Sequence, residues 1–143
     1  MNRGGVKVVA MEASSHGLAL GRVDSVNFSV AVMTNIGAEH LDFHGTREQY
    51  ILAKQKLFEM IKPSGWVVLN SDDENFLRIK NSTKGKILTY GINNQSDVMA
   101  KSFRLFLDHS EFDLSFKGNT YHVSSPVLAK FNIYNVLALV CTL

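Results

Sequence analysis

The sequence has a single cysteine, Cys141, and two prolines among its 143 residues. One cysteine cannot form a disulfide within the chain, so a disulfide framework is excluded and a reducing compartment is favoured. No apolar run approaches the length of a membrane span, and no signal peptide precedes the first apolar segment. We therefore expect a cytoplasmic protein that does not enter a membrane.

Excess charge of one sign is also missing. The chain has 15 lysines and arginines against 13 acidic residues, which gives a net charge of +2. This charge is too small to indicate a nucleic-acid partner, and no basic run with interleaved aromatic residues is present. With 45% hydrophobic and 20% charged residues, the chain can form one globular domain with a substantial core.

Polar ends are lacking as well. An apolar segment begins directly after Gly5, and the last eight residues, 136–143, lie within an apolar helical pattern. Complete domains usually end in polar, frayed segments. We therefore expect the chain to be part of a longer protein, with apolar surface exposed where neighbouring structure is missing.

Short apolar runs alternate with helical patterns over the first two thirds of the chain. We expect buried strands at 6–11, 30–33, 66–69 and 87–90. Helices are expected from Ser14 to Gly21, from Thr46 to Ile61, and after a capping box formed by Ser71 and Glu74. This alternation predicts an α/β fold with a mostly parallel, doubly wound sheet.

The pattern changes over residues 98–125. Apolar and polar residues alternate in three short segments, and the last two are separated by a turn at 117–119. Such segments are typical of a small antiparallel β meander. A final helix is expected to begin near Phe131.

One residue of the helix after Thr46 does not match its surroundings. The inward stripe consists of Tyr50, Ala53, Leu57, Phe58 and Ile61. Lys54 lies on the same stripe. Its aliphatic stem can pack while the ammonium reaches water. Alternatively, Lys54 points back toward the histidine-rich loop before the helix, because helical side chains lean toward the N-terminus. A neutral lysine amine can react with carbon dioxide to give an anionic carbamate.

Several groups that bind metals are expected at one edge of the sheet. Glu12 follows the first expected strand and His40 follows the second, and ligands of open parallel sheets bind at the carboxyl ends of strands. A Mg²⁺ ion held by Glu12, one imidazole and a carbamate on Lys54 is chemically reasonable. His40 and His44 are spaced for zinc, but this spacing alone is weak evidence. The other interpretation is that each histidine is a loop residue whose ring forms a hydrogen bond with the backbone.

Three motifs, in this order, resemble those of a known family. They are MEASSHGL at 11–18, TNI with HLDFHG and the following Ala-Lys pair between 34 and 54, and FNIYN at 131–135. Together they resemble the central domain of the Mur ligases. Within that family, they are most similar to the members that add the third residue to UDP-N-acetylmuramoyl-L-alanyl-D-glutamate in peptidoglycan synthesis.

The resemblance implies a role for several residues. Glu12 and His40 match magnesium ligands, and Lys54 matches a carbamylated lysine, so His40 and Lys54 are expected to be catalytic. His44 is expected to orient the loop. The family's chemistry is amide formation that depends on ATP and Mg²⁺ and proceeds through an acyl phosphate.

The resemblance also implies which residues meet the substrates. Ser14 and Arg22 match residues that contact the UDP-muramoyl dipeptide, and Asn135 matches an asparagine that meets the adenine of ATP. A free amino acid is the remaining substrate.

Some features of the family are absent from these residues. The phosphate-binding Gly-x-x-Gly-Lys-[Thr/Ser] loop does not occur, and Ala129 stands where a glycine is usual. The chain is therefore expected to be a partial central domain without its phosphate loop, its UDP-binding domain or its C-terminal domain, and inactive by itself. Two alternatives stay open: another ligase of the superfamily, of the folylpolyglutamate or cyanophycin type, or a non-catalytic binding module with the same fold.

Overall fold

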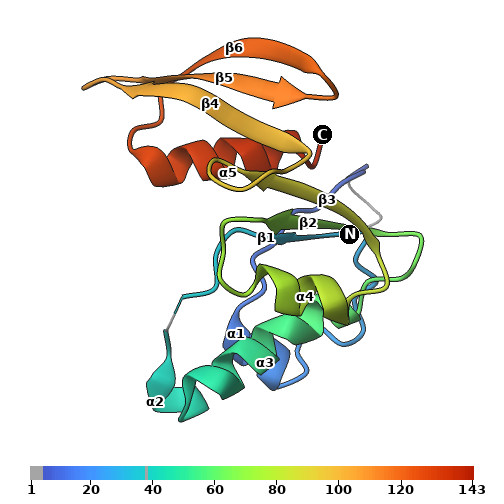
Figure 1. The fold of residues 1–143 in the computed structure, drawn as a ribbon. Helices are drawn as coiled ribbons and strands as arrows, with labels where there is room; N and C mark the ends of the chain where they lie inside the picture. The colour runs from blue at the N-terminus through green and yellow to red at the C-terminus, as the bar shows by residue number, and fades with distance from the viewer. Residues whose placement is uncertain (1–4, 38) are drawn as a thin grey trace.

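The computed structural model describes residues 5–37 and 39–143. One six-stranded sheet has its strands in the order in which they occur along the chain (Figure 1). The strands are β1 (Val30–Met33), β2 (Trp66–Asn70), β3 (Lys86–Gly91), β4 (Val98–Leu105), β5 (Ser110–Phe116) and β6 (Asn119–Ser125). The helices are α1 (Ser15–Ala19), α2 (Leu41–His44), α3 (Arg47–Glu59), α4 (Phe76–Ser82) and α5 (Lys130–Val140).

The sheet has a parallel part and an antiparallel part. Strands β1 to β4 pair in parallel, whereas β4, β5 and β6 pair antiparallel. The predicted mostly parallel sheet and the meander over 98–125 are therefore confirmed. The two parts join through a short ladder, because β3 and β4 pair only at Tyr90 with Val98 and at Gly91 with Met99.

Both faces of the parallel part of the sheet are covered. Alternate residues of β2 point to opposite faces, so that Val67 and Leu69 belong to one core cluster and Val68 to the other. Helices α3 and α4 cover the first face, and α5 lies against the second, between β3 and the meander (Figure 1). The parallel strands β1 and β2 are apolar on both sides because each side has a core to fill.

Two predicted helix starts are confirmed. The Oγ of Ser14 accepts a hydrogen bond from the backbone N–H of Gly17 at 3.1 Å. The Oγ1 of Thr46 accepts one from the N–H of Gln49 at 3.2 Å. Each hydroxyl satisfies an N–H group that has no partner within its helix.

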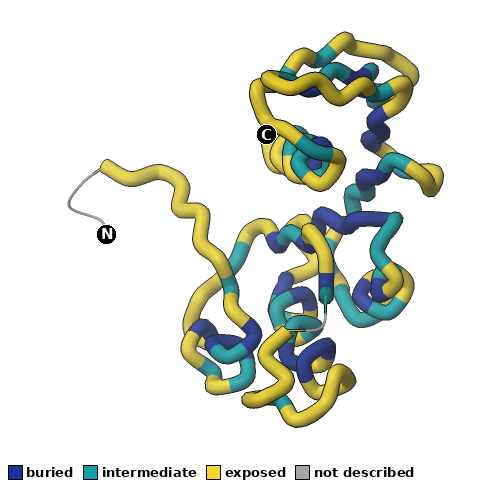
Figure 2. Tube along the Cα trace, turned by 90° about the vertical axis from the view of Figure 1, so that its left-hand side faces the viewer, coloured by how far each residue is buried: buried dark blue, intermediate teal, exposed yellow. Residues whose placement is uncertain are grey.

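The strand predicted at 6–11 is wrong. These residues form an extended segment outside the sheet, which runs away from the body of the molecule (Figure 2). Val8 is 85% exposed. Apolar composition favours a strand only where a neighbouring strand and a core receive it, and this segment meets neither. The expected exposure of apolar surface is confirmed for this segment.

The capping box predicted for Ser71 and Glu74 is also wrong. The hydroxyl of Ser71 donates to the carbonyl of Tyr90 at 3.1 Å, and the carboxylate of Glu74 pairs with Arg47. Helix α4 begins only at Phe76, because the Oδ1 of Asp73 accepts from the N–H of Asn75 and holds a turn there.

No helix of the described residues is long and apolar enough to cross a membrane.

Candidate functional site

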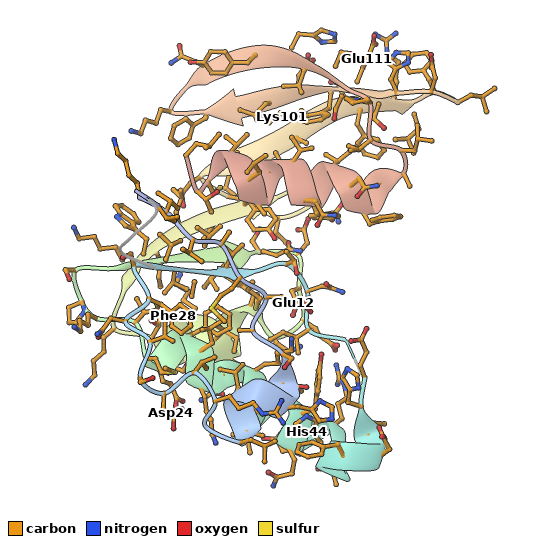
Figure 3. All side chains as sticks on the ribbon, turned by 180° about the vertical axis from the view of Figure 1, so that it is seen from behind. Glu12, Asp24, Phe28, His44, Lys101 and Glu111 are labelled. Atoms are coloured by element: carbon orange, nitrogen blue, oxygen red, sulfur yellow. The ribbon has the colours of Figure 1, made fainter. Side chains whose placement is uncertain are left out.

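Five aromatic rings meet where α1, α2 and α3 come together. We call this group the imidazole cluster: His16, His40, Phe43, His44 and Tyr50. The centroid of the His16 ring lies 4.7 Å from that of His40, 4.1 Å from Phe43 and 5.5 Å from His44. The His44 ring in turn lies 5.5 Å from that of Tyr50. Figure 3 shows Glu12 on the segment that leads into α1, and His44 beside that helix.

The backbone holds His40 in an uncommon conformation. Its φ is 56° and its ψ is 37°, in the left-handed region, at the residue before the single turn of α2. A residue with a side chain seldom adopts this conformation, and such residues gather at functional sites. Gly45, with a φ of 73°, ends the turn, and Thr46 then starts α3. The histidine-rich loop is thus held between two defined helix ends.

His44 has a nitrogen without a partner. Its Nε2 is shielded from solvent, and no described residue accepts from it or donates to it. Burial lowers the pKa of His44, and the neighbouring His16 and His40 lower it further; Asp42 opposes them, and Lys54 adds the smallest lowering effect. A second shielded atom without a partner, the Oγ of Ser15, lies on α1 next to His16.

Lys54 reaches the edge of the same cluster. It is half-buried on α3, one turn after Tyr50, and its Nζ lies 5.9 Å from the centroid of the Tyr50 ring. Tyr50, Ala53, Phe58 and Ile61 of the predicted stripe are buried. Lys54 therefore lies at the margin of the stripe, with its ammonium beside the cluster.

The unmodified side chains do not form a metal site. Among residues 5–37 and 39–143, no three acidic, imidazole or thiol groups lie close enough together to hold a metal ion. Glu12 is exposed, and no described side chain forms a hydrogen bond or ion pair with it. Mg²⁺ prefers oxygen ligands, whereas the cluster offers imidazole nitrogens and an ammonium. A carbamate on Lys54 would replace this cation with two oxygen donors, so the residues fit Mg²⁺ only with that modification.

Ser14 and Arg22 lie at the two ends of α1. Ser14 caps the helix at its N-terminus. Arg22 follows its C-terminus, is exposed, and donates its backbone N–H to the carbonyl of Gly17 at 2.9 Å. Since α1 packs on α3, both residues are joined to the helix that carries Lys54.

Hydrogen bonds link the loops at the carboxyl ends of the parallel strands. The Nδ2 of Asn70 donates to the carbonyl of Thr34 at 2.8 Å, and the N–H of Ile36 donates to the Oδ2 of Asp73 at 2.8 Å. The loops after β1 and β2 are therefore tied together. An open depression of about 360 Å³ lies beside them, lined in part by Asp73 and Asn94.

Asp72 extends this network to α5. Its carboxylate accepts from the backbone N–H groups of Ile92, Asn93 and Asn94 at 2.7 to 2.9 Å, and from the hydroxyl of Tyr134 at 2.8 Å. Burial raises the pKa of Asp72, but these four donors outweigh it and hold the pKa below its ordinary value.

Asn135 is the next residue on α5 and is exposed, with its Nδ2 donating to the Oδ1 of Asn132 at 3.0 Å. The structure thus places His40 in the imidazole cluster and Lys54 at its edge, and holds Asn135 on a different helix. Asp72 and Tyr134 did not emerge from the sequence. The polar run at 70–73 directly after a strand was the available signal.

The sequence matches the Mur ligase middle domain family over residues 1–143. It is 43% identical over 134 residues to the UDP-N-acetylmuramoyl-L-alanyl-D-glutamate--2,6-diaminopimelate ligase of Chlamydia pneumoniae. The matched region covers 94% of this chain and 28% of that ligase. It is 41% identical over 138 residues to the corresponding L-lysine ligase of Staphylococcus aureus strain MW2, with coverage of 94% and 28%.

Comparison with solved structures leads to ligases of the same family. A UDP-N-acetylmuramoyl-L-alanyl-D-glutamate--2,6-diaminopimelate ligase superposes with a TM-score of 0.81 at 33% identity, over 91% of this chain and 28% of that one. The MurF ligase of Thermotoga maritima in complex with ADP has a TM-score of 0.72 at 21% identity, over 91% and 30%, and shares the fold. The chain spans less than a third of the length of each of these relatives. The chain belongs to the Mur ligase family and corresponds to its middle domain.

Proposed function

We propose that the chain is part of the ATP-binding domain of a ligase that joins a free amino acid to UDP-N-acetylmuramoyl-L-alanyl-D-glutamate. The proposal rests on one observation about the imidazole cluster. His40, in its left-handed conformation, lies in this cluster, and Lys54 lies against the Tyr50 ring of the same cluster. The names of the two relatives support the choice of substrate, since both act on this UDP-muramoyl dipeptide.

In this proposal Glu12, His40 and a carbamate on Lys54 hold a Mg²⁺ ion. The ion, when bound, neutralises charge that develops on the transferred phosphoryl group. Lys54 supplies the oxygen donors that the unmodified cluster lacks. Glu12 precedes the cap of α1 by two residues, on the exposed segment that leads into the helix whose His16 meets the ring of His40.

The substrates meet other parts of the chain. Ser14 and Arg22 contact the UDP-muramoyl dipeptide from the two ends of α1, next to the helix of Lys54. Asn135 meets the adenine of ATP from α5, whose position is fixed by the bond between Tyr134 and Asp72. The proposed chemistry is transfer of the terminal phosphoryl group of ATP to the dipeptide carboxylate, followed by attack of the amino group on the acyl phosphate.

A ligation assay tests this function. The ligase that contains these residues is incubated with Mg²⁺, ATP, the UDP-muramoyl dipeptide and either diaminopimelate or lysine. Phosphate release and formation of the tripeptide are measured. Glu12→Ala and His40→Ala should raise the Mg²⁺ concentration needed for half-maximal rate, whereas Glu59→Ala, an exposed carboxylate on the last turn of α3, should not.

Other outcomes would identify the alternatives. Activity on a folate or on a cyanophycin-type substrate, with none on the muramoyl dipeptide, would overturn the proposed substrate. ATP binding without phosphate release with any of these substrates would favour a binding module.

The 143 residues alone should release no phosphate above background. They contain no Gly-x-x-Gly-Lys-[Thr/Ser] loop to hold the β- and γ-phosphates. Loss of one preorganised donor costs about 100- to 1,000-fold in rate, and here a whole set of donors is missing. Phosphate release by this chain that disappears in Glu12→Ala would contradict the assignment.

A further inference from the structure

The strongest unexplained feature of the site is the Nε2 of His44. It is shielded from solvent and has no partner among the described residues. A buried polar atom left without a hydrogen bond is strongly unfavourable, and nearly all buried polar atoms in proteins have a partner. A group that a modification or a ligand adds beside the nitrogen can supply this partner.

The surroundings of His44 narrow the choice of partner. The rings of Phe43 and Tyr50 lie 4.8 and 5.5 Å from the His44 ring, and neither ring face offers a strong acceptor. Lys54 lies against the same Tyr50 ring, with its Nζ 5.9 Å from the centroid. Tyr50 and Lys54 are four residues apart on α3, so their side chains lie on one face of the helix. His44 and Lys54 therefore lie against the same Tyr50 ring, and a carbamate on Nζ would bring oxygen acceptors to this part of the cluster.

We propose that His44 is a positioning residue that donates a hydrogen bond from Nε2 to a carbamate oxygen on Lys54. The inference rests on the proposed function, which requires that carbamate. In the modification, the neutral amine of Lys54 forms an N–C bond with dissolved carbon dioxide and releases one proton to water. The product has two oxygens beyond Nζ that share one negative charge, where the ammonium had only donors.

This bond explains why a histidine occupies a site lined by aromatic rings. Phenylalanine would fill the same space without a shielded polar atom. An N–H donor to an anionic oxygen forms a stronger hydrogen bond than a neutral pair, and it favours the carbamate over the free amine. The second oxygen remains available for a metal ion, so His44 also fixes which way the carbamate faces.

The level of carbamylation tests the proposal directly, without an activity assay. The protein is titrated with ¹³C-bicarbonate, and the carbamate carbonyl signal is followed by NMR. The Lys54→Ala variant identifies the signal by its loss. For His44→Phe we expect half-carbamylation to need about 10-fold more bicarbonate. Its thermal stability should equal or exceed that of the wild type, because an unpaired buried nitrogen has been removed.

Matched variants separate the bond from packing. His44→Gln places an amide N–H near the position of Nε2 and should carbamylate close to the wild-type level. His44→Asn, whose amide is too short to reach there, should behave like His44→Phe, and this pair decides the matter if His44→Phe does not fold. His122→Phe, at an exposed histidine on β6, should match the wild type.

Wild-type carbamylation of both His44→Phe and His44→Asn would overturn the role of His44 and leave the proposed function intact. A wild-type protein with no signal that depends on Lys54 would instead overturn the carbamate itself, and with it the proposed metal site and the inference.

Discussion

The hydroxyl of Tyr134 donates to the carboxylate of Asp72 at 2.8 Å, and this bond joins α5 to the loop after β2. Three backbone N–H groups of the loop after β3 donate to the same carboxylate. The Asp72 carboxylate therefore connects two loops at the carboxyl edge of the sheet with the helix that bears Asn135. This arrangement predicts effects on stability, on acid resistance and on nucleotide binding.

Tyr134→Phe should lower the free energy of unfolding by about 2 kcal/mol, because it removes one donor to a charged acceptor and leaves the three backbone donors in place. In the complete ligase it should also raise the KM for ATP, since Asn135 is the next residue on α5. Denaturant unfolding and steady-state kinetics measure the two effects. Tyr121→Phe, at an exposed tyrosine on β6, is the matched control and should change neither.

Asp72 should make stability depend on pH in the acid range. Its pKa is lower in the folded protein than in the unfolded chain, where an aspartate titrates near 4. The carboxylate therefore contributes stability above about pH 4, and this contribution is lost as the pH falls through the folded pKa.

The Asp72→Asn variant tests this dependence. It should be less stable than the wild type at pH 7, and the difference should shrink as the pH drops below about 4. Unfolding curves between pH 2 and 7 would show it. Asp24→Asn, at an exposed aspartate, should keep the wild-type profile, and a pH-independent difference for Asp72→Asn would contradict the assignment.

Ala129→Gly should stabilise the protein by about 1 kcal/mol. Ala129 has a φ of 70° and a ψ of 151° at the start of α5, in a region that essentially only glycine occupies without strain. The opposite sign is expected for Ala138→Gly, where the residue is buried in the interior of the same helix and glycine weakens it by a similar amount. If both variants are destabilised alike, the backbone at Ala129 is not strained.

Lys54→Ala should abolish ligation in the complete enzyme, because alanine cannot form a carbamate. Short-chain carboxylic acids should restore part of the rate, since they can place oxygens in the space that the lysine leaves. Lys56→Ala, at an exposed lysine one half-turn further along α3, is the control and should retain wild-type activity. A fully active Lys54→Ala enzyme would exclude the carbamate.

Local patterns predicted most of the fold. The apolar runs at 30–33 and 66–69 became β1 and β2, and the alternation over 98–125 became the meander. Ser14 and Thr46 cap helices because an N-cap depends only on residues within one turn. The Lys117–Gly118 turn closes the β5–β6 hairpin as expected, with both residues at positive φ.

Features that depend on distant partners were not predicted. Tyr134 and Asp72 are 62 residues apart, so no local spacing indicates their bond. The segment at 6–11 has the composition of a strand, but composition does not provide a neighbour. The loop histidines were identified as candidates, whereas their contact with His16 of α1 required the packing of three helices.

The β3–β4 ladder has the fewest residue pairs of any in the sheet, and we expect it to separate two cooperative units. Only two residue pairs join the parallel strands to the meander, while α5 contacts β2, β3 and β4 and so spans the junction. Opening at this boundary breaks few backbone hydrogen bonds. It requires mainly that α5 separate either from β2 and β3 or from β4. Amide protons of β5 should therefore exchange with solvent through a lower-energy opening than those of β2, and ATP, by holding α5 in place, should slow the exchange of both.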